Sequence, residues 1–176
     1  MPHSSLVVVI RGGSGTGKSS LALSLRSSFR RGVTIESDRI REMQNAVDWM
    51  NKDNYRDCLS LVATTAEYFI RRRVTPITVV DKFAADALHY FRSLLPHSTT
   101  LAVISLYADE RTIRDRMRIR EGDRLAPDAV ANSLEQNREE RVISGLSLDT
   151  STMTLAEVHS ATVHFITTHF EDRSDS

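Results

Sequence analysis

The stretch Arg11–Ser20, RGGSGTGKSS, decides the fold of this protein. It follows the apolar run Leu6–Ile10, LVVVI, and precedes a segment with the pattern of a helix. The spacing from Gly12 to Ser19 matches G-x-x-x-x-G-K-[ST], whose glycines let backbone N–H groups turn toward phosphate oxygens at the start of a helix. The sequence therefore predicts a buried strand, a phosphate-binding loop and a helix, in this order.

The residues of this loop have expected roles in binding a nucleoside triphosphate and Mg²⁺. Lys18 is expected to reach the β- and γ-phosphates during catalysis, and Ser19 is expected to offer its hydroxyl to Mg²⁺. The residues expected to contact the nucleotide here are Gly12, Gly13, Ser14, Gly15, Thr16, Gly17, Lys18, Ser19 and Ser20. The full spacing and the strand-to-helix context disfavour the alternative, a glycine-rich turn with a chance Lys-Ser pair.

The rest of the chain alternates between strand and helix patterns. Strands are expected at 33–36, 77–80, 101–107 and 146–149, and helices at about 18–30, 39–48, 54–73, 84–95, 109–120, 128–142 and 154–170. This alternation predicts a parallel sheet with helices on both faces. We expect the α/β fold of a P-loop NTPase, with a five-stranded parallel sheet and a small arginine-bearing lid.

Length and composition limit the classes of function. The 176 residues suit one domain, expected over 1–170 and followed by a disordered tail at 171–176. Lys+Arg and Asp+Glu both number 23, so the net charge does not indicate a protein that wraps nucleic acid or lies on a membrane. Cys58 is the single cysteine, which excludes an internal disulfide, and the apolar run near the start is too short for a signal peptide or a membrane span. A cytoplasmic location is expected.

Asp38 is the candidate general base. It follows the strand expected at 33–36, and ligands of parallel α/β sheets lie at the carboxyl ends of the strands. Arg41 follows three residues later on the same expected helix face, so both side chains are candidates for binding the substrate. The alternative is that Asp38 only caps the helix that begins there.

Asp81 occupies the corresponding position after the strand expected at 77–80. Its carboxylate is a candidate to hold a Mg²⁺-bound water beside Ser19, or to contact the substrate. A cap on the helix that starts near Ala84 is the alternative. Lys82 is expected to face solvent.

The arginine-rich segment 111–124, RTIRDRMRIREGDR, is expected to supply the lid. Phosphoryl transfer requires positive charge over the migrating group. We expect one or two of Arg116, Arg120 and Arg124 to point inward, and we take Arg120 and Arg124 as the catalytic candidates. The other arginines of the segment are expected on a solvated helix face.

Five segments, taken in order, carry a resemblance to a known family: GGSGTGKSS, SDRIR, ITVVDKFAADALHYFRSLLP, EGDRLAPDAV and LDTSTMTLAEV. They resemble the small P-loop kinases, within these the group that contains chloramphenicol phosphotransferase and the kinase domain of phage-type polynucleotide kinases. The resemblance implies an ATP:hydroxyl phosphotransferase with Asp38 as base and a lid arginine near Arg120 or Arg124. It also implies that Asp149 and Thr150 lie near the adenine, and that 49–73 forms a wall of the substrate site.

The sequence thus predicts ATP- and Mg²⁺-dependent transfer of the γ-phosphoryl group to a hydroxyl of a small molecule such as an antibiotic, a sugar or a nucleoside. A 5′-hydroxyl polynucleotide kinase is the second hypothesis, disfavoured because Lys82 follows Asp81 where polynucleotide kinases resemble D-T-N. The third is a nucleotide-binding module or slow NTPase that acts through a protein partner. The identity of the acceptor and the oligomeric state stay open.

Overall fold

The computed structural model of the chain describes residues 5–45, 48, 51–122, 125, 128–140 and 145–170, without the side chains of 136–140 and 169–170. The tail expected at 171–176 lies outside the described residues, as do the first positions of the expected substrate wall, 49 and 50.

Five parallel strands form one sheet in the order β2-β3-β1-β4-β5. The strands are β1 (Leu6–Arg11), β2 (Val33–Glu36), β3 (Ile77–Val80), β4 (Thr100–Tyr107) and β5 (Leu146–Asp149). Strand β1 lies at the centre and is buried along its whole length, as its continuous apolar run predicts. The expected fold class is confirmed. Because all strands are parallel, their carboxyl ends meet at one edge of the sheet, where β1 leads into the phosphate loop.

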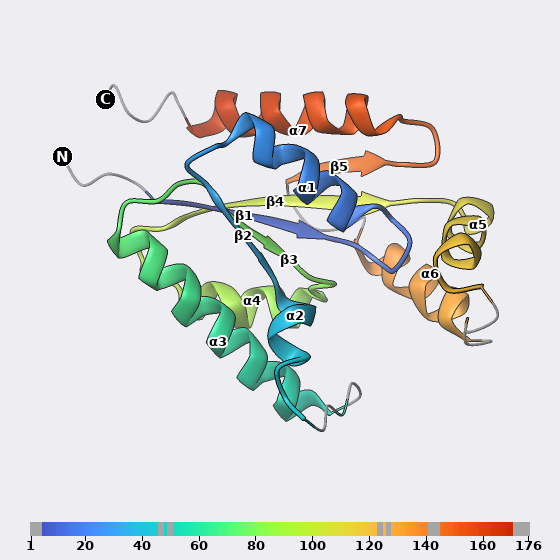
Figure 1. Cartoon of the computed structure of the whole chain (residues 1–176), viewed down its shortest axis with the longest axis horizontal. Helices are drawn as coiled ribbons and strands as arrows, with labels where there is room; N and C mark the ends of the chain where they lie inside the picture. Colours follow the sequence, from blue (N-terminus) through green and yellow to red (C-terminus); the bar gives the residue numbers. More distant parts are fainter. Residues whose placement is uncertain are drawn as a thin grey trace.

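Helices cover both faces of this sheet (Figure 1). Helices α1 (Lys18–Ser28) and α7 (Leu155–Phe170) lie over one face, and α3 (Lys52–Arg71) and α4 (Ala85–Leu94) lie over the other. Side chains of β1 alternate between two hydrophobic cores: Val7 and Val9 pack with α3 and α4, whereas Val8 and Ile10 pack with α1 and α7.

The segment after β4 forms a small helical unit at the carboxyl edge of the sheet. Helices α5 (Glu110–Glu121) and α6 (Ala129–Glu140) pack on each other beyond the end of β4 (Figure 1). Ile113 and Met117 of α5 and Val130 of α6 form a third, smaller hydrophobic cluster with Ala108. This unit is the expected arginine-bearing lid.

Helix α2 is shorter than the sequence predicted. It spans Ser37–Arg41, whereas the pattern indicated a helix at 39–48. Ser37 and Arg41 are buried, but the residues that follow are polar or strongly exposed, with Met43 80 % exposed. Since a short helix is stabilised mainly by burying an apolar face, the exposed Glu42, Met43 and Asn45 do not favour its continuation beyond Arg41.

Candidate functional site

The phosphate loop turns sharply between β1 and α1, and two of its glycines are required by the backbone. Gly12 has φ 147°, and a Cβ atom there would lie 2.4 Å from the carbonyl oxygen of Leu106. Gly17 caps α1 in the left-handed conformation, with φ 97°. Glycine is the residue that takes such conformations at low cost, so the spacing of the motif follows directly from the path of the chain.

Lys18 lies across the loop. Its Nζ donates hydrogen bonds to the carbonyl oxygens of Gly12, at 2.6 Å, and Gly13, at 2.9 Å. Thr16 Oγ1 also donates to the Gly13 carbonyl, at 2.8 Å. The ammonium group is therefore held at the first half of the loop, where an incoming phosphate would meet it.

Ser19 and Ser20 are exposed in the first turn of α1, beside Lys18. Within the described residues, no group of three or more His, Cys, Asp or Glu side chains could hold a metal ion. A Mg²⁺ ion bound by nucleotide phosphates needs only one or two protein ligands and keeps several waters. The exposed Ser19 hydroxyl fits this requirement.

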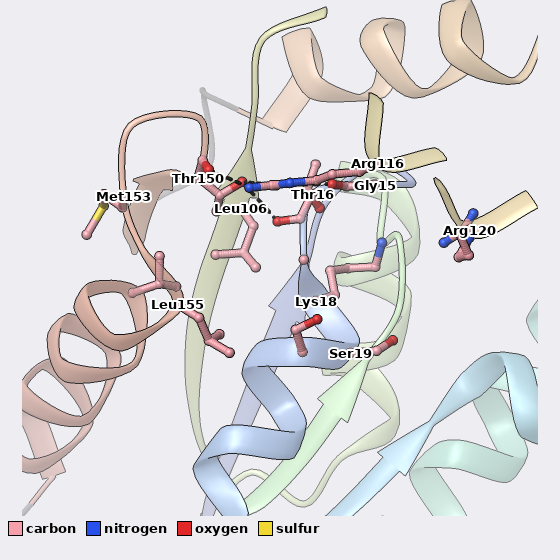
Figure 2. A pocket seen from close by; sticks show the side chains of 13 residues that line it. Gly15, Thr16, Lys18, Ser19, Leu106, Arg116, Arg120, Thr150, Met153 and Leu155 are labelled. Carbon is pink, nitrogen blue, oxygen red and sulfur yellow. Dashed lines mark hydrogen bonds between the residues drawn. The ribbon is translucent and has the colours of Figure 1, made fainter. Parts of the chain in front are cut away.

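A pocket of about 470 Å³ lies beside the loop (Figure 2). Its walls come from the loop and α1, from β4, from α5, from the segment between β5 and α7, and from the start of α7. The lining residues are Gly15, Thr16, Gly17, Lys18, Ser19, Ser20, Leu106, Arg116, Arg120, Thr150, Met153, Leu155 and Val158. Figure 2 shows Met153 and Leu155 on one side and Lys18 and Ser19 on the other. The pocket thus joins a polar end at the phosphate loop to an apolar end beside α7.

Arg116 of α5 connects the two sides of this pocket. Its Nη1 donates to the carbonyl oxygen of Gly15, at 3.2 Å, and to Thr150 Oγ1, at 2.8 Å, and its Nη2 donates to the Thr150 carbonyl, at 2.7 Å. Thr150 Oγ1 in turn lies 3.1 Å from the carbonyl oxygen of Thr16. A single guanidinium therefore ties the phosphate loop to the segment after β5 (Figure 2).

One or two of Arg116, Arg120 and Arg124 were expected to point inward, and Arg116 and Arg120 both line the pocket. The Arg120 side chain is 58 % exposed and forms an ion pair with Glu121. Arg124 lies outside the described residues. Arg120 and Arg124 were expected as the catalytic residues, whereas among the described lid arginines the hydrogen bond to the loop comes from Arg116.

Asp149 and Thr150, expected near the adenine, differ in position. Thr150 is buried and lines the pocket. The carboxylate of Asp149 accepts a hydrogen bond from the Ser151 N–H at 2.9 Å, and Asp149 is not among the residues that line the pocket. Asp149 therefore shapes the turn after β5.

On the other side of the loop, Asp38 is exposed in the first turn of α2. The residue at the N-cap of α2 is Glu36, so the alternative that Asp38 caps this helix is wrong. Ser37 Oγ donates to the carbonyl oxygen of Val80, at 3.2 Å. This hydrogen bond joins the residue before Asp38 to the residue before Asp81, and it brings the two strand ends together.

Asp81 is 5 % exposed, and both of its carboxylate oxygens accept hydrogen bonds. The Lys82 N–H donates to Oδ1, at 2.5 Å, and the Tyr55 hydroxyl donates to Oδ2, at 3.0 Å. Burial raises the pKa of Asp81, and the charge of Asp38 raises it further, while these hydrogen bonds oppose the shift. Helix α4 has Ala84 at its N-cap, so the alternative that Asp81 caps it is also wrong.

Arg41 and Tyr55 complete this side of the site. The guanidinium of Arg41 lies 5.4 Å from the centroid of the Tyr55 ring, and Nη2 donates to the carbonyl oxygen of Asp48, at 3.4 Å. Sequence reasoning did not single out Tyr55. The sequence feature that could have identified it is its position four residues before Leu59, on the buried face of α3. A tyrosine hydroxyl at such a position needs a hydrogen-bond partner.

The comparisons with known proteins agree with this architecture. Residues 7–141 match the AAA domain family AAA_33. No curated protein sequence matches that of this chain at a significant level. None of the helices within the described ranges has the length and apolar character needed to cross a membrane.

Solved structures share the fold at low sequence identity. A gluconokinase from Sinorhizobium meliloti 1021 superposes with a TM-score of 0.71 and 20 % identity, over 98 % of this chain and 96 % of that one. The APS kinase of Mycobacterium tuberculosis, in complex with AMPPNP and APS, gives 0.69 and 15 %, over 93 % and 98 %. The tunicamycin resistance protein of Deinococcus radiodurans gives 0.69 and 14 %, over 94 % and 95 %. The narrower resemblance to the chloramphenicol phosphotransferase group stays a prediction.

The family match spans residues 7–141 of the 176, and the phosphate loop and the parallel sheet around it agree with this match. The chain therefore belongs to the AAA domain family AAA_33.

Proposed function

We propose that this protein is an ATP- and Mg²⁺-dependent phosphotransferase that moves the γ-phosphoryl group of ATP to a hydroxyl of a small molecule. The observation that carries the proposal is the joining of two carboxylate-bearing strand ends by the Ser37–Val80 hydrogen bond, next to the loop that would hold the donor. A switch needs no acceptor and no base, whereas a kinase needs both. The similarity in fold to a gluconokinase and an APS kinase supports the same class of reaction.

ATP would occupy the pocket of about 470 Å³. Its phosphates would lie on the loop N–H groups at the positive end of α1, and its base would lie against Met153, Leu155 and Val158. The Arg116 guanidinium and Thr150 would border the base, and Asp149 would contribute through the turn it holds. Mg²⁺, bound to the phosphates and to Ser19, would neutralise charge on the leaving group, with Asp81 as a candidate partner of one of its waters or of the substrate.

In the transfer step, the acceptor oxygen forms a bond to the γ-phosphorus while the bond to the β,γ-bridging oxygen breaks and ADP leaves. The proton of the acceptor hydroxyl passes to the Asp38 carboxylate, which is exposed and able to reach a substrate. Lys18, with Arg120 or Arg124 from the lid, stabilises the charge on the migrating group. Arg41 orients the acceptor.

A transfer assay with γ-labelled ATP tests the proposal. The acceptors are sugars, nucleosides, hydroxylated antibiotics and 5′-hydroxyl oligonucleotides, and label is expected on at least one small molecule. ATP that binds without labelling any acceptor would favour the nucleotide-binding module instead. Preferential labelling of oligonucleotides, with a KM that rises steeply with salt, would favour the polynucleotide kinase.

Asp38→Asn tests the role of the base in the same assay. The variant is expected to bind ATP normally and to lose transfer by about 10²- to 10⁴-fold, the usual contribution of a general base. Asp86→Asn is the matched control, because Asp86 is exposed at the start of α4 and, within the part of the chain that the structure describes, accepts from the neighbouring Ala87 N–H alone. Full turnover by Asp38→Asn would remove the base from the mechanism.

A further inference from the structure

A second pocket, of about 240 Å³, adjoins the phosphate loop at Ser14. Its walls are the start of the loop, the residue after Asp81, and the facing sides of α5 and α6. The lining residues are Ser14, Lys82, Met117, Glu121, Asp128, Ala129, Asn132 and Ser133. It shares none of them with the nucleotide pocket, and the two pockets adjoin along the loop and along α5.

The position of this pocket along the loop suits an acceptor. The nucleotide pocket contacts the loop from Gly15 onward, whereas the second pocket contacts it at Ser14. The Lys18 ammonium, which would reach the γ-phosphate, lies at Gly12 and Gly13, on the second pocket's side of Gly15. In-line transfer requires donor and acceptor on opposite sides of the migrating group, and an acceptor in a pocket separate from the nucleotide pocket is compatible with this requirement.

Lys82 connects the second pocket to the carboxylates of the proposed mechanism. Lys82 follows Asp81 directly, and its N–H donates to the Asp81 carboxylate. The hydrogen bond from Ser37 Oγ to the Val80 carbonyl, at 3.2 Å, joins the residues that directly precede Asp38 and Asp81. An acceptor held against Lys82 is therefore close to the candidate base.

The chemistry of the walls indicates what kind of acceptor fits. Only Met117 and Ala129 are apolar, and the other lining residues carry hydroxyl, amide, ammonium or carboxylate groups. Asn132 Nδ2 donates to Asp128 Oδ2 at 3.3 Å, and the amide oxygen of Asn132, which accepts no hydrogen bond from the described residues, is an acceptor for a ligand hydroxyl. The volume is below the roughly 300–1,000 Å³ of sites for drug-sized ligands.

We infer that this pocket binds the phosphate acceptor and that the acceptor is a small polyhydroxylated molecule, a polyol or a sugar, rather than an apolar antibiotic or an oligonucleotide. The inference rests on the proposed function and narrows it. The side chain of Ser133, which is 2 % exposed, donates to the Ser14 carbonyl at 2.6 Å. This hydrogen bond links α6, one wall of the pocket, to the phosphate loop.

Steady-state kinetics with a panel of polyols and sugars test the inference. In Asn132→Leu, which removes the amide and narrows the pocket, and in Lys82→Met, the acceptor KM is expected to rise about tenfold, as for one lost hydrogen bond. The KM for ATP should stay within about twofold of the wild-type value, because neither residue lines the nucleotide pocket. ATP binding and the melting temperature of each variant show that it is folded.

Arg31→Met is the matched control for Lys82→Met, since Arg31 is an exposed cation just before β2, at the opposite edge of the sheet. Unchanged acceptor KM values in both pocket variants, or transfer to apolar acceptors in preference to polyols, would overturn the inference while leaving the kinase proposal standing. Absence of transfer by the wild type to every acceptor would instead reject the proposed function itself, and the inference with it.

Discussion

The hydroxyl of Tyr55 donates to Oδ2 of Asp81 across 3.0 Å and so joins α3 to the end of β3. The ring of the same tyrosine lies under the guanidinium of Arg41. One side chain thereby contacts two of the charged groups that the proposed mechanism assigns to the acceptor side.

Tyr55→Phe keeps the ring and removes this hydrogen bond. We expect kcat/KM for the acceptor to fall about tenfold, as for a lost hydrogen bond to a carboxylate, with the KM for ATP unchanged. Tyr90→Phe is the control, because it removes a hydroxyl that bonds to Ser60 and so joins α3 to α4 rather than to Asp81. Equal kinetics in the two variants would mean that Tyr55 has only a structural role.

Arg116→Ala breaks the link between Gly15 and Thr150. The KM for ATP is expected to rise about 10- to 100-fold because the guanidinium makes hydrogen bonds to both walls of the nucleotide pocket. Isothermal titration with a non-hydrolysable ATP analogue measures the loss directly. Arg114→Ala, which removes an exposed partner of Glu110 one turn away, should bind normally; a similar loss there would point to a general effect on α5.

Gly12→Ala and Gly17→Ala separate steric clash from backbone strain in the phosphate loop. At Gly12 the added Cβ would meet the Leu106 carbonyl at 2.4 Å, and we expect a loss of about 3 kcal/mol in the free energy of unfolding. At Gly17 nothing lies within 4 Å, so only the cost of the positive φ applies, about 1–2 kcal/mol. Urea denaturation at neutral pH measures both, and a reversed order would contradict the loop geometry.

Asp109 predicts a pH dependence of stability. Its carboxylate caps α5 by accepting from the Thr112 N–H, and this bond lowers the pKa of Asp109 below its ordinary value. A lowered pKa contributes stability that is present above the unfolded-state pKa and is lost as the pH falls through the folded-state value. Asp109→Ala should therefore lower the melting temperature at pH 7, and the difference from the wild type should shrink below pH about 4.

Asp109→Asn provides the control, since asparagine caps a helix about as well as aspartate but carries no titratable group. Its melting temperature is expected to stay near the wild-type value at pH 7. If Asp109→Ala and the wild type differed by the same amount at pH 3 and pH 7, the charge of the cap would contribute nothing.

Much of the fold was predictable because its signals are local. The β-branched run before the phosphate loop indicated β1, and the strand at Leu146–Asp149 was expected at its observed bounds. The helix after β2 was predicted too long, because its continuation at Glu42, Met43 and Asn45 resembles a helix in pattern but is exposed. The positions of Asp38 and Asp81 at strand ends followed from the rule for parallel sheets, whereas their alternative roles as caps could be rejected only from the observed helix starts.

The sequence by itself determined the phosphate loop and the alternation of strands and helices around it, because glycine spacing and apolar runs act within a few residues. Only the tertiary structure decided the strand order β2-β3-β1-β4-β5, the pairing of Tyr55 with Asp81, and the choice of Arg116 as the arginine that contacts the loop. Arg116 and Gly15 are 101 positions apart. A contact of that kind depends on the strand order, which places the segments that follow different strands side by side at one edge of the sheet. No local sequence pattern encodes this order.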